Sequence, residues 1–596
     1  MSKKSKKSGR EVRKLRKQPL RIRAGEFFER VGDHFSDFFV SRLPNVRDVK
    51  LWVVEWSLLV LVVFLLAVVQ IFWYGDAFQT EAYTKGGDYV EATIGKVNSL
   101  NPLYVSTGSE RVLSKLLFAN LVTIDESGHL KGELAESVKM SDDGLEWTVK
   151  MREGVYWSDG VEVNADDLMY TLDLIKNPDA KTTIASSLAS IDVEKIDDYT
   201  VVFKLPSIYL NFKELLEFPV VPEHVLGEIS PALIYESDFS LNPVVSGAFK
   251  LNTIQIGGSD KSLQTVYLSR NNNYFKGEAK LDSFTLKVYE SDNDIVSALN
   301  DAEVNATAEL DDSDGARVSR ALKYRRALTN NGVYAFFNTS KGVVKEAKVR
   351  NAIAKGLDIT EILENEELQA RRLYYPMLEE QGKGLDLPQK MIADKEEAKK
   401  ALIDAGYKYN GDQLVDGENK KVSLKVVVQK RDEISQVAER FADGLRALGY
   451  DVNLVEYDES TGASFWNAVI VPRDYDILIH EVNLGVNLDL FTYYSSTQAN
   501  EMGWNFSNYK NALADDALLS ARTTLDSELR KAKYNSFLHY WEEDMPSIPL
   551  YQSVVNYYYS DNVEIFSESM HLTKANDRFQ SVHNWAAKKK SVKLTP

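Results

Sequence analysis

The feature that most constrains this chain is the apolar run over residues 52–74, WVVEWSLLVLVVFLLAVVQIFWY. At about 1.5 Å per residue, a helix of this length spans a hydrocarbon core of about 30 Å. Aromatic residues stand at both ends, where Trp and Tyr prefer the membrane–water interface. A signal-peptide core is usually only about 7 to 15 residues long. We therefore predict an uncleaved transmembrane signal anchor over residues 51–75; a cleavable signal peptide and a buried core helix are the alternatives.

The charge of the chain changes sign across this run. Residues 1–50 hold 15 Lys or Arg against 6 Asp or Glu, a balance of +9, and the net charge of −17 leaves −26 for the rest. Basic flanks stay in the cytoplasm. We therefore expect a basic cytoplasmic tail over residues 1–50 and a large extracytoplasmic C-terminal part, held at the cell membrane by a single helix. Its negative charge would repel phosphates, so nucleic acid is not an expected partner.

Apolar residues also recur at helical spacing within the basic tail. They are Phe27, Phe28, Val31, Phe35, Phe38, Phe39 and Leu43. Such a stripe predicts an amphipathic helix, which lies either on the inner leaflet or against a partner protein.

Composition and missing motifs exclude several chemistries. The chain has 596 residues, 44% of them hydrophobic, which is enough for two or more cores. It has no Cys, so it has no disulfide, thiolate nucleophile or Cys-ligated metal. It contains neither G-x-x-x-x-G-K-[ST] nor H-E-x-x-H. Asp311, Asp312 and Asp314 lack the period of a calcium loop and are interpreted as a solvated turn. We expect neither an enzyme nor a bound metal or cofactor.

Residues 134–168 predict a defined local structure. Apolar and polar residues alternate on both sides of an Asp143-Gly144 turn, which is typical of a half-buried β-hairpin. The apolar positions are Val138, Met140, Leu145, Trp147, Val149 and Met151. Asn164 is then placed to cap a helix that carries Asp166 and Asp167 in its first turn. Trp147 and Trp157 are expected to stabilise the hairpin.

From about Glu81 onward the chain predicts mixed α and β structure, without a long linker or an internal repeat. Strand patterns cover residues 265–269, 284–289, 422–428 and 475–480. One helical stripe is Val437, Phe441, Leu445 and Leu448, and Gly449 is expected to end that helix in a left-handed conformation. Leu518, Ala521, Leu525 and Leu529 predict one face of another helix.

Residues 134–168 also resemble the signature region of the family 5 extracytoplasmic solute-binding proteins. Other blocks resemble that family in the expected order, over nearly the whole region after Glu81. They include Ser99-Leu100-Asn101-Pro102, SGAFKL, LSRNNNYFKGEAKLDSFTLKV, YAFFNTS, VRNAIAKGLD, EEAKKALIDAGY, NFSNYKNALADDALL and MPSIPLY. Each block alone is weak, and their order makes the resemblance specific.

The resemblance implies an α/β, two-lobed periplasmic-binding-protein-like fold of the large peptide-binding type, here preceded by one transmembrane helix. We expect the chain to cross between the lobes near residues 332–338 and 548–555. Lobe I would then comprise residues 82–332 plus 550–590, and lobe II residues 333–549. Such proteins capture peptides or related small solutes for ABC importers, so permease subunits are expected partners. A ligand-sensing receptor or a scaffold with the same fold is the alternative.

The segment YDILIHEVNLGVNLDLFTYYSST resembles the place where peptide-binding relatives carry "gW..D..dP" and where an aspartate meets the peptide α-amino group. Aligned on Gly485, the later Asp of that motif falls on Asp489. The ammonium-binding Asp falls on Val486, and Leu490 replaces the Pro. This difference favours a ligand with hydroxyls or amides, or a blocked peptide, over a peptide with a free amino group. A nickel chelate also stays among the candidate ligands.

The resemblance and the residue types together nominate a set of ligand-binding residues. From lobe I they are Tyr104, Val105, Ser106, Val244 and Ser246, and from lobe II His480, Asn483, Asn487, Asp489, Tyr493 and Trp504. Tyr493 and Trp504 offer flat walls, and core packing is the alternative for at least one of them. His480 and Asn483 either supply neutral polar groups or simply finish a strand.

Overall fold

The computed structural model describes residues 50–77, 79–184, 188–257, 263–364, 370–458, 464–567 and 570–593. The chain forms two units, residues 1–82 with 590–596 and residues 83–589. The described part of the first unit contains helix α2 (Lys50–Ala77) and strand β1 (Gln79–Thr84), which pairs with β21 (Lys588–Lys593). The amphipathic helix predicted within residues 27–43 lies outside the described residues.

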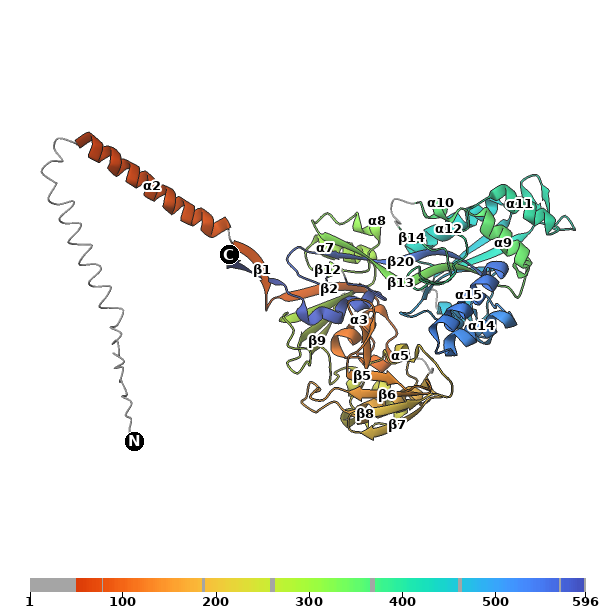
Figure 1. Ribbon diagram of the computed structural model, residues 1–596, viewed down its shortest axis with the longest axis horizontal. Helices are drawn as coiled ribbons and strands as arrows, with labels where there is room; N and C mark the ends of the chain where they lie inside the picture. Colours follow the sequence, from red (N-terminus) through yellow and green to blue (C-terminus); the bar gives the residue numbers. More distant parts are fainter. Residues whose placement is uncertain are drawn as a thin grey trace, which may run out of the picture. The chain divides into compact units, whose positions relative to one another are not determined.

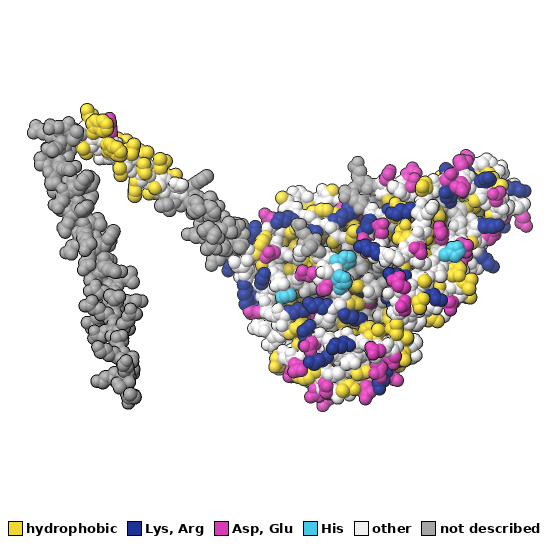
Figure 2. All heavy atoms as spheres, in the orientation of Figure 1, with side chains coloured by type: hydrophobic (Ala, Val, Ile, Leu, Met, Phe, Trp, Pro, Cys, Tyr) yellow, Lys and Arg dark blue, Asp and Glu magenta, His cyan; other side chains and the backbone are white. Residues whose placement is uncertain are grey.

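Helix α2 carries the apolar run. Its window Leu51–Gln70 has a mean hydropathy of 2.6, and none of it is buried. Hydrophobic side chains cover its described surface, whereas Lys, Arg, Asp and Glu are mixed over the face of the second unit seen in Figure 2. By length and composition α2 can cross a membrane, although a signal sequence has the same properties. The anchor therefore stays a prediction.

Two separate hydrophobic cores organise residues 83–589, and we call the parts around them lobe I and lobe II. The core of lobe I takes side chains from residues 89–306 and 557–585. The core of lobe II takes side chains from residues 333–551. A smaller cluster around Leu299 and Tyr558 packs in lobe I. The fold is α/β, as expected.

One sheet of eleven strands continues through both lobes. Its order is β18-β17-β19-β13-β20-β12-β2-β11-β10-β9, and β14 pairs with β20. In lobe I its strands are β2 (Asp88–Ile94), β9 (Phe249–Gly257), β10 (Leu263–Arg270), β11 (Ser283–Tyr289) and β12 (Ala306–Thr307). In lobe II they are β14 (Arg371–Arg372), β17 (Ser423–Gln429), β18 (Asp451–Tyr457) and β19 (Ile477–Asn483).

Two long antiparallel strands join the lobes, β13 (Lys323–Phe337) and β20 (Ser547–Tyr559). Figure 1 shows both strands running from one lobe into the other. In β13, Ala327 packs against the core of lobe I and Val333 belongs to that of lobe II. In β20, Tyr551 belongs to lobe II and Tyr557 to lobe I. The chain therefore passes twice from core to core, each time within a strand.

The remaining elements flank this sheet. Lobe I adds an antiparallel sheet of order β5-β6-β8-β7, built from β5 (Ala135–Met140), β6 (Glu146–Met151), β7 (Asp192–Asp197) and β8 (Thr200–Lys204), and a small pair β3 (Val122–Ile124) and β4 (Leu130–Gly132). Its helices are α3 (Gly108–Leu117), α4 (Ala165–Lys176), α5 (Phe212–Leu215), α6 (Glu223–Leu226), α7 (Asp292–Asn300), α8 (Asp312–Gly315) and the 3₁₀ segment η10 (Ala575–Asn584).

Lobe II adds the strand pair β15 (Lys408–Asn410) and β16 (Gln413–Val415). Its helices are α9 (Ala347–Gly356), α10 (Ile359–Leu363), α11 (Lys395–Asp404), α12 (Asp432–Ala447), α13 (Phe491–Tyr494), α14 (Ala512–Thr523) and α15 (Ser527–Asp544).

Most local predictions are confirmed. β5 and β6 form the predicted hairpin, with Gly144 at φ 74° in the turn. Asn164 caps α4 by accepting a hydrogen bond from the backbone N–H of Asp166. Trp157 is fully buried, but its indole donates to Asp167 of α4, so this contact holds the capped helix and the role of Trp157 in the hairpin stays a prediction. Strand patterns at β10, β11, β17 and β19 are also confirmed, and Gly449 follows α12 at φ 98°.

One helix prediction is wrong. The stripe from Leu518 to Leu529 belongs to two helices, because α14 ends at Thr523 and α15 begins at Ser527. The side chain of Asp526 accepts from the backbone N–H of Glu528 and Leu529, so it caps a new helix instead of continuing the old one. Leu525 and Leu529 are accordingly exposed.

Candidate ligand-binding site

A cavity of about 1070 Å³ lies between the two lobes. Lobe I lines it with residues near the end of α4, the segment after it, and the segment after β8. Lobe II lines it with Trp466, Thr492, Gln498, Met502, Trp504, Leu519, Arg522 and Thr523. Ligand sites of small molecules typically measure about 300–1,000 Å³ and are mostly apolar with a few polar groups. This cavity is therefore the candidate site.

An aromatic wall forms the lobe II side of the cavity. Trp504 is 44% exposed, and its ring centroid lies 5.4 Å from that of Trp466 at an interplanar angle of 52°. Phe506 continues the cluster at 5.9 Å from Trp504. Exposed indole faces of this kind stack on flat or apolar groups.

Arg473 holds the turn that bears this wall. The residue is buried, and its Nη2 donates to the carbonyl oxygens of Asn500 at 3.0 Å and Gly503 at 2.8 Å. These two carbonyls flank Met502 and precede Trp504. A buried guanidinium needs several hydrogen-bond acceptors, and here the backbone of the turn supplies two of them. The hydrogen bonds fix the turn, and the turn positions Trp504 before a ligand binds.

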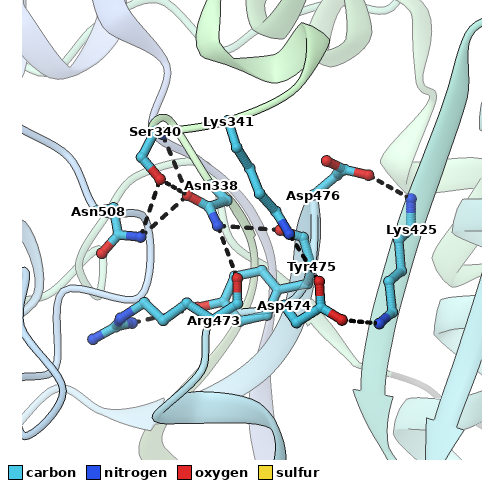
Figure 3. A network of polar contacts seen from close by, with 9 residues as sticks. All are labelled: Asn338, Ser340, Lys341, Lys425, Arg473, Asp474, Tyr475, Asp476 and Asn508. Carbon is cyan, nitrogen blue, oxygen red and sulfur yellow. Dashed lines mark hydrogen bonds and ion pairs between the residues drawn. The ribbon is translucent and has the colours of Figure 1, made fainter.

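The network in Figure 3 anchors Arg473 in turn. Asn338, directly after β13, donates from Nδ2 to the carbonyl oxygens of Arg473 at 3.1 Å and Tyr475 at 3.2 Å. Asp474 pairs with Lys341 at 3.1 Å and with Lys425 at 2.7 Å. The network ties the turn of the aromatic wall to the end of the crossing strand β13.

Side chains of both lobes meet at one loop of lobe II. We call this set the interlobe clamp: Tyr209, Asn211, Glu214, Asn487, Leu488 and Asp489. Asp489 accepts from Arg522 of α14, with Nη2 at 2.7 Å, and from the hydroxyl of Tyr209 in lobe I at 3.2 Å. The Arg522 guanidinium also lies 4.6 Å from the Tyr209 ring. Burial raises the pKa of Tyr209 far above its usual value, and the negative charge of Asp489 adds to the rise, so the hydroxyl remains a donor.

The rest of the clamp joins Glu214 and Asn211 of lobe I to the same loop. Glu214 Oε1 accepts from the backbone N–H of Asn487 at 2.6 Å and from its Nδ2 at 2.8 Å. Asn211 Nδ2 donates to the carbonyl oxygen of Leu488 at 3.1 Å. Burial raises the pKa of Glu214 to about 7, although the hydrogen bonds from Asn487 oppose the rise. The lobes are thus held together by polar contacts at the edge of the cavity.

The structure places the lobe I candidates outside the cavity lining. Tyr104 is buried and donates its hydroxyl to the carbonyl oxygen of Ala180 at 2.7 Å. Val105 is half-buried beside it, and Ser106 donates to Glu110. Ser246 is buried and accepts from the backbone N–H of Ala119 at 3.0 Å, while Val244 packs on the core of lobe I.

The lobe II candidates separate into three groups. Trp504 lines the cavity, and Asn487 and Asp489 belong to the clamp. His480 stacks on Phe465 at 5.6 Å, and burial lowers its pKa to about 4, so the ring is neutral at pH 7. The side chain of Asn483 donates from Nδ2 to Asn331 at 2.6 Å and accepts at Oδ1 from the backbone N–H of Gly485 at 3.1 Å. The hydroxyl of the buried Tyr493 donates to the carbonyl oxygen of Asn483. His480, Asn483 and Tyr493 are thus engaged within the protein.

The sequence patterns missed several residues of this site. Tyr209 and Glu214 lie between recognisable blocks, and Trp466 follows no periodic pattern. Arg522 lies next to the apolar position Ala521, and no motif marks it as a site residue. In the described ranges of the chain, no group of three or more His, Asp or Glu side chains could hold a metal ion.

An α/β fold with two cores, two crossing strands and a cavity between the lobes defines a periplasmic-binding-protein fold. The model of the bacterial extracellular solute-binding proteins, family 5 Middle, matches residues 129–504. The chain belongs to this family, and it is therefore an extracytoplasmic solute-binding protein and not an enzyme.

Individual relatives agree with this assignment. The oligopeptide-binding protein AppA of Bacillus subtilis (strain 168) is 29% identical over 483 residues, which cover 78% of this chain and 86% of AppA. Protein XP55 of Streptomyces lividans is 26% identical over 458 residues, covering 73% of this chain and 78% of XP55. The structure of Bacillus subtilis AppA in complex with a nonapeptide has a TM-score of 0.69 at 26% identity, covering 85% of this chain and all of that one. NikZ of Campylobacter jejuni in complex with Ni(L-His) shares the fold, with a TM-score of 0.69 at 22% identity, covering 84% of this chain and 99% of NikZ.

Proposed function

We propose that this protein is the membrane-anchored substrate-binding component of an ABC importer, and that it captures a peptide or a related small solute in the interlobe cavity. The observation that carries the proposal is the cavity itself, which has an aromatic wall on one lobe and is bordered by the interlobe clamp. Such an arrangement suits a ligand that is enclosed when two lobes close over it by a hinge motion.

The proposed roles follow from position. Trp504 and Trp466 contact the solute, and Arg473 positions them. Asn487 and Asp489 stabilise the closed arrangement of the lobes, because they form hydrogen bonds with Glu214 and Tyr209 of the other lobe. The relative AppA is described as oligopeptide-binding, which supports a peptide or a similarly sized solute.

The membrane part completes the proposal. Helix α2 anchors the protein, residues 1–50 face the cytoplasm, and the acidic binding domain faces outward. We place lobe I at residues 82–332 plus 550–590 and lobe II at 333–549, with the hinge in β13 and β20. Permease subunits of the importer are then the expected partners.

Native mass spectrometry of the full-length protein, purified in mild detergent without denaturation, tests the capture of a solute. We expect a bound mass that is released on unfolding. The double variant Trp466→Ala/Trp504→Ala should lose this mass, while Leu529→Ala, a substitution at a 62% exposed residue of α15, should keep it. A wild-type protein that carries no solute, and that gains none from a peptide digest, would contradict the proposal.

Association with permease subunits is tested separately. Affinity purification of the tagged full-length protein from membranes of its own host should recover permease and ATPase subunits. Recovery of a signalling protein in their place would contradict the transport role and leave solute capture intact.

A further inference from the structure

Among the described residues that line the interlobe cavity, the charged side chains all have the same sign. Among its described lining residues they are Lys176, Lys181 and Arg522, and no Asp or Glu contributes to that lining. The chain outside residues 1–50 carries a balance of −26, so a positively charged cavity is contrary to the overall composition. A cavity lined by one sign of charge attracts solutes of the opposite sign.

Arg522 is already neutralised within the protein. Its guanidinium pairs with Asp489 at 2.7 Å, and the side chains of both residues are largely buried. This pairing also commits the Asp489 carboxylate, which accepts from Arg522, from Tyr209 and from the backbone N–H of Phe491. Asp489 is therefore poorly placed to neutralise an ammonium group of a ligand.

In the described part of the chain, neither Lys176 nor Lys181 forms an ion pair with a carboxylate. Lys176 is half-buried at the end of α4. Its Nζ donates to the carbonyl oxygen of Ile191 at 2.5 Å, and this hydrogen bond holds the ammonium group at the lobe I side of the cavity. Lys181 is exposed. Asp179 lies between them in sequence, but it is exposed and does not line the cavity.

Closing the lobes makes this charge pattern selective. A ligand enclosed in the cavity loses water, so each charged group on it needs a partner of opposite charge. The cavity provides ammonium groups on the lobe I side and indole faces on the lobe II side. An anionic ligand with a flat or apolar part satisfies both sides, whereas an enclosed cation meets repulsion.

We propose that the solute is anionic: a peptide or conjugate that carries free carboxylates without a compensating ammonium group. Lys176 and Lys181 receive its carboxylates, and Trp466 and Trp504 receive its planar or apolar part. This inference rests on the proposed function, since it names the class of solute that the interlobe cavity captures.

Isothermal titration of the full-length protein in detergent tests the inference, after bound solute has been removed by reversible partial unfolding. Three probes of equal length are compared: acetyl-Glu-Trp-Glu, acetyl-Gln-Trp-Gln-amide and acetyl-Lys-Trp-Lys-amide. We expect the acidic probe to bind about tenfold more tightly than the basic one at low salt, with the neutral probe between them.

The double variant Lys176→Gln/Lys181→Gln should reduce this preference to about threefold or less. Lys131→Gln/Lys139→Gln is the matched control, because it removes the same charge from exposed positions of lobe I outside the cavity. The control should retain the full preference. Unchanged melting temperatures in both variants ensure that the comparison concerns binding.

Equal affinities, or tighter binding of the basic probe, would overturn the charge inference and leave solute capture standing. Binding of none of the three probes would overturn it as well. The proposed function fails only if native mass spectrometry also finds no retained solute, so the two failures are distinguishable.

Discussion

The most informative single perturbation is the loss of the buried ion pair between Glu91 and Arg578. Glu91 lies in β2 and Arg578 in η10, and their side chains are 0% and 2% exposed. The carboxylate accepts from Arg578 Nη2 at 2.5 Å, from Tyr89 Oη at 2.9 Å and from Tyr557 Oη at 2.8 Å. The contact joins early and late segments of the chain, because β2, β20 and η10 all contribute to it.

Replacing Arg578 by Met keeps an apolar stem of similar length and removes the charge. The carboxylate of Glu91 is then buried without its cation, which costs about 3–5 kcal/mol. Coulomb attraction gives the same range, since two charges about 4 Å apart attract by about 4 kcal/mol at an effective dielectric of about 20. The matched control is the double variant Glu91→Gln/Arg578→Met, which buries no charge. We expect it to recover at least half of the lost stability.

Thermal unfolding of the full-length protein at pH 7, followed by circular dichroism, measures the effect. The entropy of unfolding is about 2.1 cal/mol/K per residue, so a loss of about 4 kcal/mol lowers the melting temperature by about 4 °C when both lobes unfold together. The fall is larger if lobe I unfolds alone. An Arg578→Met variant that melts within about 1 °C of the wild type would refute the reasoning. A double variant as unstable as the single one would refute the assignment of the cost to the uncompensated charge.

Three further predictions use the same unfolding assay. Burial raises the pKa of Glu214 from 4.5 to about 7, so folding becomes less favourable as pH rises from about 4.5 to 7 and the buried carboxyl ionises. The variant Glu214→Gln cannot ionise, and it should therefore be more stable than the wild type above pH 7, by at most about 3 kcal/mol. Below pH 4.5 this stabilisation should be absent. A benefit confined to acid pH would have the wrong sign. Asn164→Ala removes the cap of α4 and should cost about 1 kcal/mol, while Asn164→Asp should cost less. Gly449→Ala should lower the free energy of unfolding by more than about 1 kcal/mol, because φ is 98° and the added Cβ would lie 2.7 Å from the Asp412 carbonyl oxygen. An unchanged free energy of unfolding would contradict this.

The local elements were predictable because their signals are short-range. The alternation around Gly144 and the side chain of Asn164 act on backbone groups only a few residues away, and both appear in the structure as expected. The error at Leu525 has the same origin. Its spacing suits one continuous helix, but the cap formed by Asp526 begins a new helix at this point.

The candidate site was only partly predictable. Residue type and resemblance point to Trp504 and Asp489, which lie in the aromatic wall and in the clamp. They point equally to Ser246, yet Ser246 is buried and hydrogen-bonded to the backbone N–H of Ala119. A sequence block predicts where a segment lies in the fold more reliably than which way one side chain points.

By itself, the sequence determined the apolar N-terminal helix, the acidic balance of the binding domain, the α/β fold and the family. These properties depend on composition, on periodicity and on the order of blocks along the chain. Only the tertiary structure decided which groups meet between the lobes. Tyr209 and Asp489 are 280 residues apart, and their contact exists because β13 and β20 bring the two lobes together. The charge of the cavity is likewise tertiary, since Asp489 neutralises Arg522 and leaves Lys176 and Lys181 as the other charged side chains of the described lining.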